Sequence, residues 1–324
     1  MIRRALLAAL AVCLAAPAAA EPLSLTTTRL ESFALTDAGE PKGPLTFIGG
    51  LNVTSDDQRF GGLSGIDMLD GETALMVGDK GIYVRAQLVR ENGRLVGLAD
   101  GEIGNLFPSG DVEKNVGDAE DIALDPEDRM KGVVVRERQA NAMLAFRLED
   151  GRPVDFIPMR VGADDRILRS NQGLESVAFA PATSPVAGEI VTIAEHPPRD
   201  AADIPGWVAG IGSFEIVRRD EFDISSARFL PDGDLILLER RFSPGWGIAM
   251  RLRRIPGETV KVGALLDGDI LLEAGMTDQI DNMEGLAVSE DETGRTILTL
   301  VSDDNFNFLQ RTLILQFALV EAGL

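Results

Sequence analysis

The sequence predicts an all-β protein, a β-propeller of five or six four-stranded blades closed by N- and C-terminal strands. A hairpin design recurs five times along the chain, and its apolar strands are rich in Val, Ile and Leu and bounded by turn residues. Sustained helical periodicity with capping residues is missing. Equivalent positions in the five first strands lie 50 to 59 residues apart, at Ser64, Glu120, Glu175, Ser225 and Glu284. A unit of four strands and about fifty residues is typical of a propeller blade.

The first twenty residues predict a secretory signal peptide. Basic residues at positions 3 and 4 precede an apolar run over 5–16, and small residues at 18–20 offer a cleavage site after Ala20. We therefore expect a periplasmic or secreted protein whose mature chain, residues 21–324, is one domain. Cys13 is the only cysteine and lies in the signal segment, so the mature protein must be stabilised by its core and not by disulfides.

The strongly acidic composition excludes some classes of partner. The formal net charge is −21 at pH 7, whereas nucleic acids and anionic membrane surfaces require a basic footprint. No apolar run after the signal segment reaches transmembrane length, so we expect no membrane insertion after signal cleavage.

Each hairpin consists of an apolar strand, a turn, a second apolar strand and a terminal acidic residue. The hairpins occupy, in order, residues 62–79, 120–137, 174–195, 224–239 and 283–303. Further amphipathic strands follow, for example 146–148 and 248–252. The C-terminal strand, 312–320, is expected to pair with N-terminal strands within 23–53, either completing the fifth blade or forming a sixth.

The geometry of a hairpin places the start of its first strand and the end of its second strand on the same face of the disc, near the axis. The strand-ending acids are Asp79, Glu137, Glu195, Glu239 and Asp303. Together with the five first-strand positions they make ten residues, of which eight are carboxylates. The opposite ends hold ordinary turns, so this acidic face is the predicted functional face.

Converging carboxylates repel one another, and a divalent cation with oxygen ligands would offset that repulsion. Calcium is the expected ion, because one His and no mature Cys disfavour softer metals. Asp281 and Asn282 add nearby oxygen donors. The predicted metal ligands are Asp79, Glu120, Glu175, Glu239, Glu284, Asp303 and Asp304.

Basic residues on the same rim suggest that the site holds a small anionic ester. The predicted substrate-binding residues are Lys80, Arg138, Arg240 and Ser64, and the predicted catalytic residues are Glu120, Glu175, Glu284, Asp303 and His196. A Ser-His-acid triad is disfavoured, because Ser64 lacks the spacing of a nucleophile elbow. The competing interpretation is that the acids pair with arginines such as Arg240 and Arg241 and join the blades together.

Five segments lie in order along the chain: 61–66 (GGLSGI), 172–176 (QGLES), 239–240 (ER), 281–285 (DNMEG) and 302–306 (SDDNF). Together they resemble the phytase-like domain family, exported bacterial proteins described by an "esterase-like activity of phytase". The resemblance implies a propeller fold and hydrolysis of phosphate or carboxylate esters.

Two hypotheses about function follow. The first is an exported, metal-dependent ester hydrolase that acts on phosphoric esters at the acidic centre. The alternative is a non-catalytic periplasmic propeller that binds a ligand or a protein partner, with the metal as a structural element.

Overall fold

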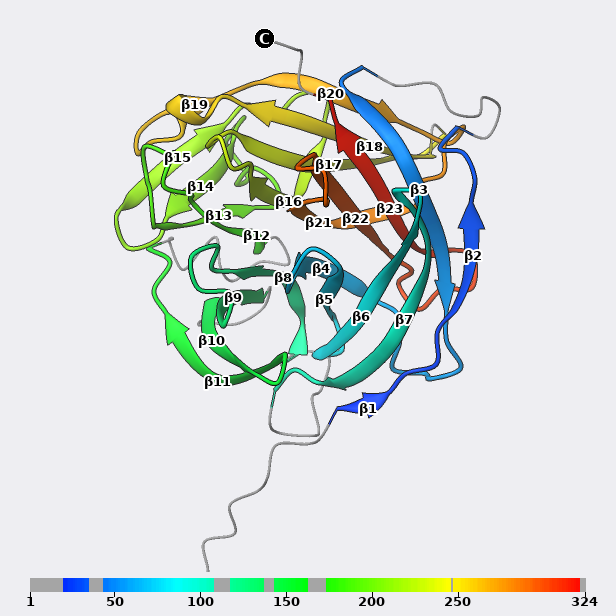
Figure 1. Cartoon of the computed structure of the whole chain (residues 1–324). Helices are drawn as coiled ribbons and strands as arrows, with labels where there is room; N and C mark the ends of the chain where they lie inside the picture. The colour runs from blue at the N-terminus through cyan, green and yellow to red at the C-terminus, as the bar shows by residue number, and fades with distance from the viewer. Residues whose placement is uncertain are drawn as a thin grey trace, which may run out of the picture.

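Five β-sheets surround a central axis, as the computed structural model shows (Figure 1). The structure describes residues 20–34, 43–107, 117–136, 143–162, 173–245 and 247–320. The predicted β-propeller is therefore confirmed, with five blades. Residues 1–19, and with them most of the expected signal peptide, lie outside the described residues.

Each blade is a sheet of four or five strands that follow one another from the axis outward. Blade 1 contains β4 (Leu63–Met68), β5 (Thr73–Gly78), β6 (Ile82–Glu91), β7 (Arg94–Asn105) and β1 (Glu21–Pro22). Blade 2 contains β8 (Ala119–Leu124), β9 (Lys131–Arg136), β10 (Met143–Glu149) and β11 (Arg152–Met159). Blade 3 contains β12 (Leu174–Phe179), β13 (Ile190–Ala194), β14 (Ile204–Val208), β15 (Gly212–Ile216) and β19 (Leu265–Leu266).

The last two blades follow the same plan. Blade 4 contains β16 (Asp223–Phe229), β17 (Leu235–Ser243), β18 (Gly247–Ile255) and β20 (Asp269–Ala274), with the 3-10 turn η1 (Gly257–Thr259) between β18 and β20. Blade 5 contains β21 (Asn282–Glu290), β22 (Thr296–Asp303), β23 (Thr312–Leu319), β3 (Leu45–Thr54) and β2 (Thr26–Leu30). All five predicted hairpins are present as the two innermost strands of a blade.

The ring closes through the fifth blade. The C-terminal strand β23 pairs antiparallel with the N-terminal strand β3, which in turn pairs with β2. The expected pairing of the two ends of the chain is confirmed. The N-terminal strands complete the fifth blade and do not form a sixth.

The innermost strands β4, β8, β12 and β16 are almost entirely buried, and β21 is buried over residues 283–287. Each of them carries polar or charged residues among its apolar ones. A polar network lies among them. Arg228 of β16 donates hydrogen bonds to both carboxylate oxygens of Asp121 in β8, each at 2.7 Å. The same guanidinium donates to the backbone oxygens of Ile66 in β4 and Val177 in β12. This buried ion pair therefore connects four blades at the axis.

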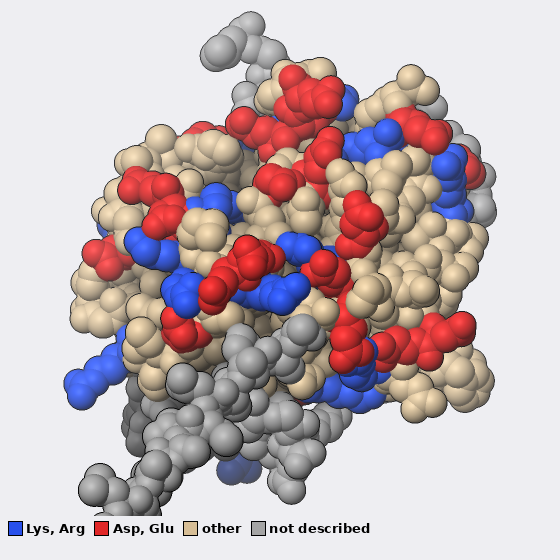
Figure 2. Space-filling model, turned by 60° about the horizontal axis from the view of Figure 1, so that its bottom comes forward, with Lys and Arg blue, Asp and Glu red and all other residues tan. Residues whose placement is uncertain are grey.

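The surface shown in Figure 2 carries interspersed acidic and basic side chains, without a continuous basic area among the described residues on that face. Within the described ranges, no helix is long and apolar enough to cross a membrane.

Candidate active site

The innermost strands all begin on one face of the disc, and each has a β-bulge near its start. In every blade the register between the first and second strands shifts, so one residue of the first strand has no direct partner. A bulge bends the strand and redirects the extra side chain, often beside an active site. The bulged residues are the five equivalent positions of the repeat: Ser64, Glu120, Glu175, Ser225 and Glu284.

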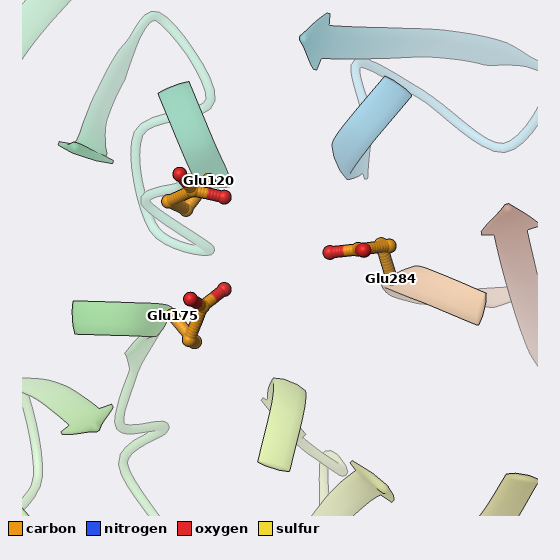
Figure 3. A group of neighbouring side chains, drawn as sticks. All are labelled: Glu120, Glu175 and Glu284. Carbon is orange, nitrogen blue, oxygen red and sulfur yellow. The ribbon is translucent and has the colours of Figure 1, made fainter. Parts of the chain in front are cut away.

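Three of these bulges bring carboxylates together. Glu120, Glu175 and Glu284 reach from β8, β12 and β21 toward a common centre (Figure 3), and one oxygen of each lies within 4.8 Å of the others. Their exposed fractions are 9%, 4% and 5%. Burial raises the pKa of Glu175 well above its usual value, and the negative charges of Glu120 and Glu195 raise it further. The centre therefore favours a bound positive charge.

Arg240 of β17 brings one guanidinium into this group. It donates hydrogen bonds to Glu284, to Oδ1 of Asn282 at 2.7 Å, and to Oε1 of Glu195 at 3.1 Å. Asn282 also donates through Nδ2 to Oε1 of Glu284 at 2.7 Å. Burial raises the pKa of Glu284 although Arg240 lowers it. Arg240 therefore connects blades 3, 4 and 5 at the centre. Its positive charge lowers the pKa of Glu175, but burial and the neighbouring carboxylates outweigh this effect, and the pKa of Glu175 stays raised.

His196 reaches this group through Glu195. Its Nδ1 lies 3.3 Å from Oε2 of Glu195, which is an ion-pair distance, and this contact raises the pKa of His196. Burial raises the pKa of Glu195, but the contacts with His196 and Arg240 outweigh it, and the net shift is downward. The structure thus places His196 beside the carboxylates, separated from the three central ones by Glu195.

A second acidic cluster adjoins the first at the junction of blades 5 and 1. Ser64 donates through Oγ to Oδ1 of Asp79 at 2.7 Å, and Asp303 accepts the backbone N–H of Asn305 at 2.6 Å. Burial raises the pKa of Asp303 to about 8, with further contributions from the charges of Glu284 and Asp79. Asp79 and Asp303 therefore lie near enough to Glu284 to interact with it electrostatically.

The central carboxylates fit a divalent cation. Calcium binds oxygen ligands at about 2.3–2.6 Å, so two ligands on opposite sides of the ion are about 5 Å apart. The separation of at most 4.8 Å among the oxygens of Glu120, Glu175 and Glu284 is compatible with one shared ion. Carboxylate oxygens are also the hard donors that calcium prefers.

Glu239 does not join this group, contrary to the prediction that it is a metal ligand. Side chains alternate along β17, so Glu239 and Arg240 point to opposite faces of the sheet. Glu239 is fully buried and lies 2.5 Å from Nη2 of Arg253 in the neighbouring strand. Its carboxylate is therefore part of an ion pair within blade 4.

Asp304, another predicted metal ligand, contacts the backbone where blade 5 meets blade 1. Its Oδ1 accepts the N–H groups of Gly62 at 2.9 Å and Phe306 at 3.0 Å, and its Oδ2 accepts the hydroxyl of Thr312 at 3.0 Å. The ammonium of Lys80, a predicted substrate ligand, lies 3.2 Å from the centre of the Phe306 ring. Both residues therefore have structural contacts at the rim. Arg138, the remaining predicted substrate ligand, and Glu137 lie outside the described residues.

Glu195 and Asn282 have a larger part in the centre than the sequence indicated. Glu195 is one of the strand-ending acids, and Asn282 was expected only as an additional oxygen donor. Asn282 is two residues before Glu284 in β21, and its side chain donates to that of Glu284. A spacing of two residues at the start of the strand is therefore a usable signal. Their common contact with Arg240, from a different blade, is visible only in the structure.

The fold and the acidic centre are accompanied by a family match. The family model described as "Phytase-like: Esterase-like activity of phytase" matches residues 58–306. A search of curated proteins gave no match to the chain.

Proposed function

The chain belongs to the phytase-like family, and from this premise we propose that it hydrolyses ester bonds, with phosphoric esters as the preferred substrates. The reaction takes place at the acidic centre, where Glu120, Glu175 and Glu284 would hold a divalent cation, with calcium as the expected ion. The protein acts in the periplasm or outside the cell, as the residues of the N-terminal segment suggest. The observation that supports this proposal most directly is the convergence of three buried carboxylates beside Arg240.

The residues of the centre have distinct parts in this proposal. A bound cation would polarise the substrate oxygen and lower the pKa of a bound water. Arg240 is held by Glu284 and Glu195, which fixes the direction of its guanidinium for an anionic oxygen. Asp303 and His196, both beside the central group, are the proposed proton-transferring residues.

The substrate is a small ester and not a highly phosphorylated one. The net charge of −21 repels polyanions at long range. Phe242 of β17 is 74% exposed and follows Arg240 by two residues, so both side chains lie on the same face of the strand. An exposed aromatic ring next to the guanidinium suits an ester with an apolar or aromatic group.

One observation favours the alternative of a non-catalytic propeller. Arg240 already pairs with two carboxylates from neighbouring blades, as expected if the charges join blades together. A ligand or a protein partner would then bind at the same face, with the metal as a structural element. Turnover separates the two proposals.

The test is an assay of purified protein with nitrophenyl phosphate, bis(nitrophenyl) phosphate and nitrophenyl acyl esters, in calcium and in EDTA. We expect calcium-dependent turnover, a higher melting temperature in calcium, and loss of both effects in Glu175→Gln. The matched control is Glu215→Gln, an exposed residue of β15, which should behave like the unchanged protein. Calcium-dependent stabilisation without turnover on any substrate would leave only the binding alternative.

A further inference from the structure

A cavity lies at the opposite end of the central axis from the acidic centre. Its volume is about 480 Å³, and residues of all five innermost strands or the turns after them line it. The walls are mostly apolar and include Leu124, Pro126, Ala178, Pro181, Leu230 and Val288. Cavities of about 300–1,000 Å³ with apolar walls and few polar groups are typical small-molecule sites. The turns that looked ordinary in the sequence therefore surround a cavity.

Two side chains that line this cavity each carry one polar atom that has no hydrogen-bond partner among the described residues. One is Nε of Arg228, a side chain that is 5% exposed and whose other nitrogens donate to Asp121 and to backbone oxygens. The other is Oγ of Ser289, near the end of β21 that leads into the turn. Buried polar groups normally have partners. Both atoms are buried beneath the cavity wall, so a ligand that offers an oxygen acceptor would satisfy one of them once that side chain turns toward the cavity.

The charges around the cavity restrict the ligand further. Asp125, Glu127 and Glu290 line it, each in or beside the turn of a hairpin. The guanidinium of Arg129 lies 3.3 Å from Asp67, so its charge is compensated. Arg228 is likewise compensated by Asp121. The cavity therefore disfavours anions.

We propose that this cavity binds a small neutral or singly cationic molecule with an apolar body and one carbonyl-type oxygen. The apolar body packs against the alanine, proline and leucine side chains of the walls. The oxygen accepts from Arg228 or Ser289. The site lies at the other end of the axis from the acidic centre, and the inference does not depend on the ester hydrolase proposal.

The test uses Nile red, a neutral aromatic dye with a carbonyl oxygen, and the anionic dye anilinonaphthalene sulfonate. We expect saturable one-site binding of Nile red and at least about tenfold weaker binding of the sulfonate. Ala182→Trp, an exposed residue lining the cavity, should weaken Nile red binding at least about tenfold. Ala202→Trp, an exposed alanine away from the cavity, should leave it unchanged. Ser289→Ala should weaken binding about fivefold through the lost hydrogen bond.

Further variants keep the inference open to refutation. Glu127→Lys should strengthen binding of the sulfonate, because it reverses a charge at the cavity. Phe308 is 93% exposed and is an alternative place for a dye to bind. If Phe308→Ser abolishes Nile red binding while Ala182→Trp does not, the proposal is overturned. It is also overturned if the sulfonate binds more tightly than Nile red.

Discussion

Replacing Arg228 by methionine should strongly destabilise the propeller. Arg228 is 5% exposed and its partner Asp121 is fully buried. The substitution keeps most of the volume of the side chain but leaves the carboxylate of Asp121 without a counterion at the axis. Because the guanidinium also donates to backbone oxygens of three other innermost strands, the change affects the contacts that join the blades.

The expected magnitude follows from these contacts. Removing one partner of a buried ion pair costs about 3–5 kcal/mol. The oxygens of Ile66, Ile122 and Val177 also lose a donor, and an unsatisfied buried acceptor costs about 1–3 kcal/mol. We therefore expect Arg228→Met to lower the free energy of unfolding by an amount near the upper end of about 3–5 kcal/mol. This is a large fraction of the roughly 5–15 kcal/mol by which folded proteins are stable.

The loss of stability should also depend on pH. Burial raises the pKa of Asp121 above its ordinary value of 3.8, and Arg228 lowers it. Without Arg228 the pKa rises further, so folded Asp121 holds a proton that the unfolded chain releases. The variant then loses stability as the pH rises from the ordinary pKa of Asp121, 3.8, through its raised pKa in the folded protein. The difference between the variant and the unchanged protein should grow with increasing pH.

The assay is urea unfolding of the unchanged protein and Arg228→Met at pH 5, 6, 7 and 8. Adding Asp121→Asn to Arg228→Met should restore more than half of the lost stability, because it removes the unpaired charge. Arg147→Met is the matched control, since the ion pairs of Arg147 lie on the surface. A loss of less than about 1 kcal/mol in Arg228→Met would refute the reasoning.

In EDTA, the unchanged protein should lose stability as the pH rises from about 4 to about 8, because the pKa of Asp303 is about 8 in the folded protein and 3.8 ordinarily. Asp303→Asn should flatten this dependence of stability on pH, measured by urea unfolding. Parallel profiles of the variant and the unchanged protein would contradict the expectation. Arg240→Lys keeps the charge but loses the planar fork that reaches two carboxylates, so kcat should fall about tenfold or more in the nitrophenyl phosphate assay. An unchanged kcat would place Arg240 outside the reaction. Gly62 has a φ of +59°, and a Cβ at this position would lie 2.5 Å from a ring carbon of Phe306, so Gly62→Ala should lower the melting temperature. Gly71→Ala is the control, because its Cβ would meet no atom closer than 3.6 Å and the melting temperature should not change.

The fold was determined by the sequence because its signals are local. Alternation of apolar strands with turn residues identified the five hairpins, and all five are present. Hairpin geometry then placed the first-strand positions on one face, where Glu120, Glu175 and Glu284 do converge. These inferences needed only the fact that a hairpin returns to its starting edge.

The tertiary structure decided what depends on register and on contacts between blades. A shift of one residue along a strand reverses the face of a side chain, which is why Arg240 lies at the centre and Glu239 in the ion pair with Arg253. The assignment of β3 to the fifth blade and not to a sixth, and the buried pair of Arg228 with Asp121, depend on contacts between segments more than one hundred residues apart. Such contacts leave no periodic pattern in the sequence, so only the folded chain shows them.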